Sequence, residues 1–238
     1  MSLRAEPTIA GDASLSDGEF ESRRDCLIRQ VQMRGVTDPE VIAALRAVAR
    51  HKLVPPPLID SSYEDRPLPI GSEQTISQPT IVGLMSQWAI EGAESDHRRR
   101  VLELGTGSGY QAAVLAELFD EVFSLEVRPE LAARAKSALS RLGGRAQRVC
   151  CAVGDGSLGL DEFAPFDAIV VTAAAPSIPK ALLGQLASHG RLVIPLVIDS
   201  ENQLLHLFVR VEDGAGNEVK KVRSLPVLFV PLVSKPCP

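Results

Sequence analysis

Three glycines alternate with two hydroxyl residues in Gly105-Thr106-Gly107-Ser108-Gly109, directly after the short apolar run 101–104. Glycines let the backbone approach a ligand closely and adopt torsions that a Cβ forbids. The spacing G-x-G-x-G differs from the G-x-G-x-x-G that places a pyrophosphate on a helix N-terminus. Glu103, inside the apolar run, would repel a phosphate but suits a cation. The pattern therefore predicts a site for a cationic ligand.

Acidic residues also end the next two expected strands. Glu126 follows Gly105 by about 20 residues, where a carboxylate can accept both hydroxyls of a ribose. Asp155-Gly156 end the third strand, where a carboxylate could accept a hydrogen bond from an adenine amino group. Together these features favour S-adenosylmethionine as the cofactor. The alternative is an ordinary tight turn beside surface acids.

The elements that must position these residues alternate between strand and helix. Strands are expected near 101–104, 121–127, 148–155, 167–174, 191–198, 204–211 and 219–230, with helices near 112–118, 129–142 and 179–186. This alternation is typical of an α/β fold with a mostly parallel sheet and helices on both faces. A hairpin-type loop at 212–217 joins the last two strands and predicts an antiparallel C-terminal edge.

The part of the chain before this pattern is organised differently. Helical spacing at 19–34 and the cap Thr37-Asp38-Pro39 predict two helices, which would form a lid or an appended layer. Residues 55–79 are rich in Pro and too long for a connector, which predicts a functional loop. Asp65 and Tyr63 either shape this loop or are ordinary turn residues, and His51 is expected to be structural.

These features predict one domain. Residues 1–17 are small and polar and are expected to be disordered. Residues 18–238 would form a single domain, in which 18–95 supply N-terminal helices and the loop and 96–238 the Rossmann-like core.

Composition excludes several classes of protein. The 238 residues carry a net charge of −5, without the basic footprint of a nucleic-acid-binding protein. No apolar run is long enough for a membrane span, and the N-terminus lacks a secretory signal, so we expect a cytoplasmic protein. A monomer is the separate expectation for its oligomeric state. The cysteines and histidines show no ligand spacing, which predicts that no metal is bound; they are Cys26, Cys150, Cys151, Cys237, His51, His97, His189 and His206.

Several longer segments match one family. They are DRPLPIGSEQTISQP (65–79), VLELGTGSGYQAAVLAEL (101–118), VGDG (153–156), APFDAIVVTAAAPSIP (164–179) and GRLVIP (190–195). With these segments the chain resembles the protein-L-isoaspartate (D-aspartate) O-methyltransferase family. The glycine turn occurs in looser form in many class I S-adenosylmethionine-dependent methyltransferases, whereas PLPIG…QTISQP is far more specific.

The resemblance implies a class I methyltransferase fold and a repair activity. Such an enzyme methylates the free carboxylate of L-isoaspartyl residues in damaged proteins and peptides, leaving S-adenosylhomocysteine. The ester then closes to a succinimide, which reopens partly to normal aspartate. Whether D-aspartyl residues are also accepted stays open. Because the attacking carboxylate is already ionised at neutral pH, no general base is required.

The resemblance also assigns Ser77 to the active site. The alternative for Ser77 is a helix N-cap before Pro79. Thr75 and Ile76 would line the cofactor through their backbone. The expected cofactor-binding residues are Thr75, Ile76, Ser77, Glu103, Gly105, Thr106, Gly107, Ser108, Gly109, Glu126, Asp155 and Gly156.

Departures from the family pattern leave alternatives open. Glu73 stands where the family usually has a second glycine, and a positive φ there would cost about 1–2 kcal/mol. Leu228 stands where an arginine is common, which would weaken binding of a substrate carboxylate. One alternative is therefore a related methyltransferase with another substrate, such as a nucleic acid or a small carboxylate. The other is an inactive cofactor-binding module that recognises damaged peptide or a protein partner.

Overall fold

The computed structural model describes residues 15–93, 98–211 and 219–234. The predicted hairpin loop at 212–217 and residues 1–14 lie outside these ranges. Ser16 and Asp17, which we included in the disordered segment, are instead ordered. The Ser16 side chain and Glu19 form a capping box at the start of helix α1 (Asp17–Met33). The S-x-x-E spacing is the signature of this cap and corrects the predicted boundary.

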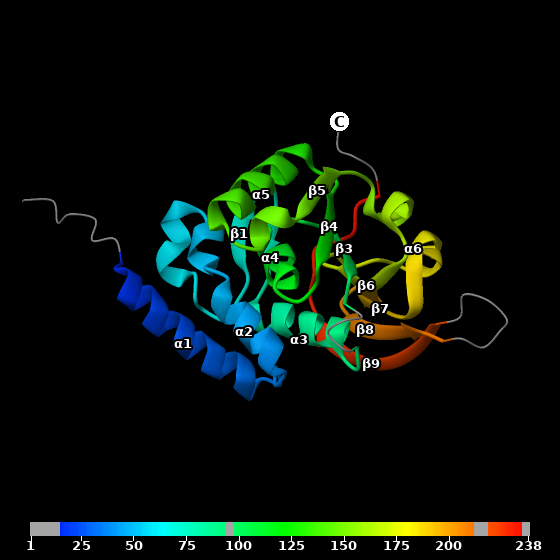
Figure 1. Cartoon of the computed structure of the whole chain (residues 1–238), viewed down its shortest axis with the longest axis horizontal. Helices are drawn as coiled ribbons and strands as arrows, with labels where there is room; N and C mark the ends of the chain where they lie inside the picture. The colour runs from blue at the N-terminus through cyan, green and yellow to red at the C-terminus, as the bar shows by residue number, and fades with distance from the viewer. Residues whose placement is uncertain (1–14, 94–97, 212–218, 235–238) are drawn as a thin grey trace, which may run out of the picture.

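Within the described residues, seven strands form one sheet in the order β5-β4-β3-β6-β7-β8-β9 (Figure 1). They are β3 (Arg100–Leu104), β4 (Glu121–Glu126), β5 (Cys150–Val153), β6 (Phe166–Val171), β7 (Leu186–Val197), β8 (Gln203–Arg210) and β9 (Val219–Val227). The neighbouring strands β5, β4, β3, β6 and β7 pair in parallel. Strands β8 and β9 then extend the sheet in antiparallel fashion. The predicted α/β sheet with an antiparallel C-terminal edge is confirmed.

Alternate residues of the strands bury opposite faces of the sheet. Val101 packs into the larger core and its neighbour Leu102 into the smaller one, as the strand period of two requires. The larger core is covered by α3 (Pro79–Ile90), α4 (Tyr110–Ala116) and α5 (Pro129–Leu142). The smaller core is covered by the short helix α6 (Lys180–Gln185) and 3₁₀ turns. Helices therefore cover both faces, as predicted, but unequally.

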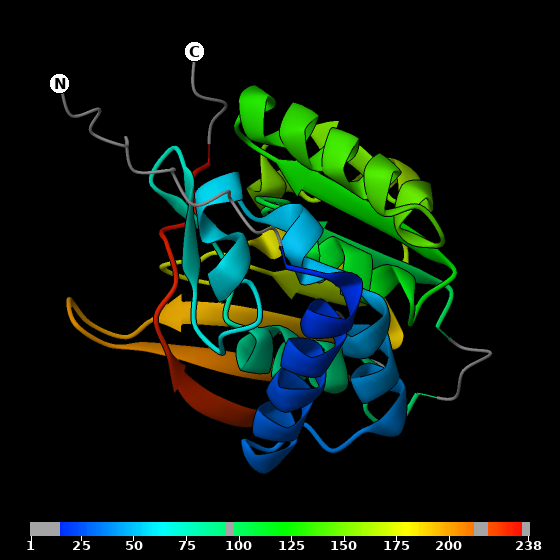
Figure 2. The ribbon, with the colours of Figure 1, turned by 90° about the vertical axis from the view of Figure 1, so that its left-hand side faces the viewer.

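The N-terminal helices form an outer layer on the larger face (Figure 2). Helix α1 and α2 (Pro39–Ala47) pack on each other and on α3, and α2 also reaches α4. Asp38 caps α2 through the backbone N–H groups of Glu40 and Val41, as the sequence predicts. This layer supports the helices that lie directly on the sheet.

A short hairpin lies in the loop for which we expected no regular structure. Strands β1 (Leu68–Gly71) and β2 (Gln74–Ile76) pair in antiparallel fashion. The ends Leu68 and Ile76 are buried, while Arg134 of α5 donates to the Ile70 carbonyl at 2.9 Å. Strands of three and four residues are too short to show a period of two, so sequence periodicity could not find them.

Candidate active site

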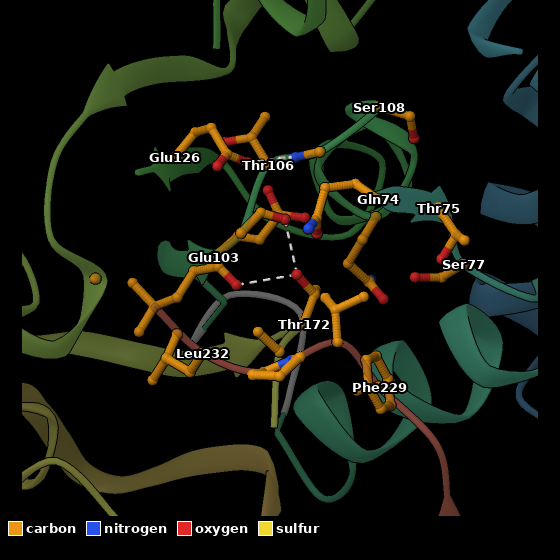
Figure 3. A pocket seen from close by; sticks show the side chains of 18 of the residues that line it. Gln74, Thr75, Ser77, Glu103, Thr106, Ser108, Glu126, Thr172, Phe229 and Leu232 are labelled. Carbon is orange, nitrogen blue, oxygen red and sulfur yellow. Dashed lines mark hydrogen bonds between the residues drawn. The ribbon is translucent and has the colours of Figure 1, made fainter. Parts of the chain in front are cut away.

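A pocket of about 610 Å³ opens at the carboxyl ends of β3 and β4. Strand order reverses between β3 and β6, and open α/β sheets bind ligands at such a switch point. Three parts of the chain build the walls: the hairpin with Ser77, the glycine turn with Glu103 and Glu126, and the segment 226–233 (Figure 3).

The first glycine of the turn is required by its surroundings. Gly105 has φ +97°, and a Cβ there would lie 2.5 Å from Oγ1 of Thr172. That hydroxyl is fixed, because it donates to the carbonyls of Leu104 at 3.0 Å and Gly105 at 2.7 Å. The turn therefore needs glycine here both for its torsion and for the close approach of β6.

The other two glycines have different neighbours. Gly107 has φ +52° and lines the pocket, whereas Gly109 is the N-cap residue of α4, with φ +84°, and lies against Leu139. A Cβ at Gly109 would lie 3.0 Å from Cγ of Leu139. Gly109 is thus placed to shape the turn and not to line the pocket.

Glu126 is held in place by backbone amides. Its Oε2 accepts from Gly107 N–H at 2.9 Å and its Oε1 from Arg128 N–H at 3.1 Å. The side chain is nearly buried at the end of β4. Each carboxylate oxygen has two acceptor positions, so one on each oxygen remains for a ligand. The carboxylate can accept two hydroxyl groups at once.

Glu103 is fully buried on β3 and lines the pocket. One oxygen accepts from the Ser124 hydroxyl, which Thr106 Oγ1 contacts at 2.6 Å. The other has no hydrogen-bond partner of normal geometry, although the Ala112 N–H lies close enough to favour the charged form. Burial raises the pKa of Glu103 to about 8; the Ser124 bond opposes this rise, and the charge of Glu126 adds to it.

The hairpin supplies a wall of hydroxyl and amide groups. Gln74, Thr75 and Ser77 line the pocket from the side opposite Glu126 (Figure 3). Ile76, which was predicted to contribute its backbone, is not among the residues that line the pocket, and its side chain is buried in the core at 1% exposure. Within the hairpin the structure therefore brings Thr75 and Ser77 to the pocket.

The N-cap alternative for Ser77 is wrong. The cap residue of α3 is Gln78, and no side chain provides the usual cap hydrogen bond from that position. Asp65 does so from the loop: its carboxylate accepts from Thr80 N–H at 2.9 Å and from the Thr80 hydroxyl at 2.7 Å. The structure thus places Asp65 in the group that shapes the loop and leaves Ser77 in the pocket wall.

The other two polar residues named near the loop lie with α1. His51 stacks on Phe20 with ring centroids 4.1 Å apart, and its Nδ1 lies 2.8 Å from the Tyr63 hydroxyl. Burial lowers the pKa of His51. Neither His51 nor Tyr63 lines the pocket, so both join the N-terminal layer to the loop.

Of the third wall, only Leu228 was singled out from the sequence. The segment 226–233 is a run of eight residues without a charge, and all of them line the pocket. Gln203 holds it by accepting from Phe229 N–H at 2.7 Å and donating to its carbonyl at 3.1 Å, while Val230 and Leu232 pair with Ala174. The signals in the sequence were this uncharged run and Leu228, which stands where an arginine is common in the family.

Four further residues singled out from the sequence differ in their relation to the pocket. Gly156 lines the pocket, but Asp155 does not: its Oδ1 accepts from the backbone N–H and the hydroxyl of Ser157. Glu73 has φ +57° at the hairpin tip, so the expected strain is present. Leu228 lies at the pocket rim with 85% of its surface exposed.

The pocket is also lined by residues that were not among the predicted site residues, including Gln74, Gln78, Gln111, Arg128 and Thr172. The described residues contain no group of three or more His, Cys, Asp or Glu arranged to hold a metal ion. In the same part of the chain, no helix is long and apolar enough to cross a membrane.

Comparison with known proteins agrees with this architecture. A solved protein-L-isoaspartate O-methyltransferase superposes with a TM-score of 0.76 at 28% identity, covering 90% of this chain and 67% of that one. A Plasmodium falciparum structure described as a putative member in complex with S-adenosyl-L-homocysteine also gives 0.76, at 24% identity, over 89% of this chain and 99% of that one. Fold and site define a class I S-adenosylmethionine-dependent methyltransferase.

The family follows from sequence. The model of the protein-L-isoaspartate(D-aspartate) O-methyltransferase family matches residues 22–236. A Gloeobacter violaceus protein-L-isoaspartate O-methyltransferase is 50% identical over 203 residues, which are 85% of this chain and 94% of that protein. The chain belongs to the protein-L-isoaspartate(D-aspartate) O-methyltransferase family.

Proposed function

We propose that this chain transfers a methyl group from S-adenosylmethionine to the carboxylate of L-isoaspartyl residues in damaged proteins and peptides. The observation that carries the proposal is the pocket in which the glycine turn and the Ser77 hairpin face each other, in a chain of this family. We also infer that residues 18–238 act as one domain, because the pocket takes walls from both 18–95 and 96–238.

The residues present fit the cofactor. Glu126 has acceptor positions for the two ribose hydroxyls, and Glu103 is a buried carboxylate with an oxygen that lacks a normal partner. At Gly107, which lines the pocket, the atom nearest to a Cβ position is 3.9 Å away, so there is room for a ligand beside the backbone. Arg128 is the one basic residue among the described lining residues, which suits a ligand without phosphate.

The chemistry needs positioning more than proton transfer. Bound S-adenosylmethionine would supply an electrophilic methyl group on a sulfonium. The residues of the chain would hold an ionised substrate carboxylate in line with that methyl group and keep water out. Hydroxyl and amide groups of Gln74, Thr75 and Ser77 are available to donate to the carboxylate, and no described histidine lines the pocket.

Ser77→Ala is expected to lower the rate of methyl transfer at least tenfold and to leave the fold intact. Losing one hydrogen bond to a charged group costs about 1.5–3 kcal/mol, and tenfold corresponds to about 1.4 kcal/mol. Single-turnover transfer with saturating cofactor measures the effect. Ser72→Ala, at the hairpin tip outside the pocket, is the control. Full activity of Ser77→Ala would remove Ser77 from the mechanism.

Cofactor affinity is expected to rise with pH. In the free protein Glu103 is protonated below its pKa of about 8, and a cationic ligand favours the ionised form. Binding therefore releases a proton, and the affinity for S-adenosylmethionine should increase up to about tenfold per pH unit below 8. Calorimetric titration between about pH 6 and pH 9 checks this slope.

Glu103→Gln is the control for this pH dependence. Charged or titratable neighbours of Glu103 are Glu126 on β4 and Cys151 on β5, and burial raises the pKa of the Cys151 thiol to about 12, so that it stays neutral. The slope should vanish in Glu103→Gln. If the affinity of this variant still rises with pH by the same amount, the pH dependence comes from a group other than Glu103.

The function itself is tested with labelled S-adenosylmethionine and two peptides that differ only in isoaspartate or normal aspartate. Base-labile label on the isoaspartyl peptide alone is the expected result. If the cofactor binds but neither peptide is labelled, the methyltransferase fold stands and the substrate assignment fails. Other carboxylates and RNA would then be tested as acceptors.

A further inference from the structure

Arg50 is a fully buried arginine that contacts the pocket wall from the core side. It begins the 3₁₀ helix η1 (Arg50–Leu53) and has no exposed surface. Its guanidinium donates to the carbonyls of Ser62, of Arg66 at 3.2 Å and of Ser77 at 3.1 Å. One side chain therefore holds three points of the segment that contains the hairpin.

The same guanidinium also reaches the cofactor side of the pocket. Its Cζ lies 5.3 Å from the ring centroid of Tyr110, a cation–π distance. Tyr110 lines the pocket and is the first residue of α4, directly after the glycine turn. Arg50 thus links the wall that carries Ser77 to the wall that carries the glycines.

This burial is costly, because a charge out of water needs a compensating partner. Among the described residues, no carboxylate forms an ion pair with Arg50, and its Nε lacks a hydrogen-bond partner. The nearby Asp65 carboxylate is engaged elsewhere, by Thr80, Gln78 and Arg34. Apolar packing would commonly stabilise such a position as well or better, so stability alone does not account for a buried arginine.

We propose that Arg50 is a positioning residue, which sets the place of Ser77 relative to the glycine turn through the Ser77 carbonyl and the Tyr110 ring. This inference rests on the proposed function. A planar fork with five donors can bind three carbonyls at fixed angles, whereas a lysine ammonium is a point charge on a flexible chain. The geometry of the guanidinium is thus the property that the hairpin requires.

The test compares Arg50→Lys with Arg98→Lys. Arg98 is also buried and makes a bidentate ion pair with Glu40, but it does not line or contact the pocket. We expect Arg50→Lys to lower kcat/KM for the isoaspartyl peptide at least tenfold, with S-adenosylhomocysteine affinity changed less than threefold. Arg98→Lys should keep kcat/KM unchanged, although its Tm should fall by about as much as the Tm of Arg50→Lys.

A second measurement separates failure of this inference from failure of the proposed function. Amide hydrogen exchange at 66–78 should be at least tenfold faster in Arg50→Lys than in Arg98→Lys, whether or not the peptide is a substrate. Unchanged exchange, or kcat/KM within twofold of the unmodified protein, would overturn the positioning role. If Arg50→Lys does not fold, Arg50→Gln, which removes the buried charge but keeps a donor, is measured in the same way.

Discussion

Gly105→Ala is expected to abolish detectable S-adenosylhomocysteine binding and to lower the free energy of unfolding by about 2–4 kcal/mol. The new Cβ would lie 2.5 Å from Thr172 Oγ1 on a backbone with φ +97°. Strand β6 or the turn must then move, and the turn carries the neighbours of Glu103 and Glu126. Calorimetric titration and chemical denaturation measure the two effects.

Two variants separate the torsion from the contact. Gly144→Ala also places a Cβ at positive φ, +56°, but with nothing within 4 Å, so it should cost only the torsional strain. Adding Thr172→Ala to Gly105→Ala removes the clashing hydroxyl and should restore part of the stability and of the binding. If the double variant is no better than Gly105→Ala, the clash with Thr172 is not the cause.

Glu126→Gln is expected to weaken S-adenosylhomocysteine binding by about two orders of magnitude, since each hydrogen bond to a charged group contributes about 1.5–3 kcal/mol. Both oxygens of Glu126 already accept from backbone amides, those of Gly107 and Arg128. A glutamine has one acceptor oxygen, so its NH₂ group would face one of these N–H donors. The ligand would lose an acceptor, and either Gly107 or Arg128 would lose the acceptor of its backbone N–H.

Glu121→Gln on the same strand is the matched control. Glu121 begins β4 at the surface and pairs with Arg100, away from the pocket. Exposed ion pairs contribute little, so binding should stay within threefold of the unmodified protein. If the affinity of Glu126→Gln for S-adenosylhomocysteine is also within threefold of that of the unmodified protein, the carboxylate does not bind the ribose hydroxyls. The ligand then lies elsewhere in the pocket.

Much of the fold could be predicted because its signals are local. Helix caps such as Asp38 act within three residues, and apolar runs separated by helical patterns define parallel strands. Two predictions failed, for different reasons. The capping box at Ser16 was overlooked, and β1 and β2 were too short to show a period.

For the site, the sequence by itself determined the glycine turn and the acids at the ends of β3 and β4. Parallel strands bring their carboxyl ends to one edge of the sheet, so Glu103, Gly105 and Glu126 had to meet there. Their chemical types then restrict the ligand. No knowledge of packing was needed for this conclusion.

Only the tertiary structure decided which remaining residues reach the pocket. It buried the Ile76 side chain in the core, left Asp155 bonded within its own turn, and brought 226–233 to the pocket as a third wall. It also placed Arg50 against the Ser77 carbonyl, 27 residues further along the chain. Contacts over such separations leave no periodicity in the sequence, because they depend on how whole elements pack and on which buried polar groups must be satisfied.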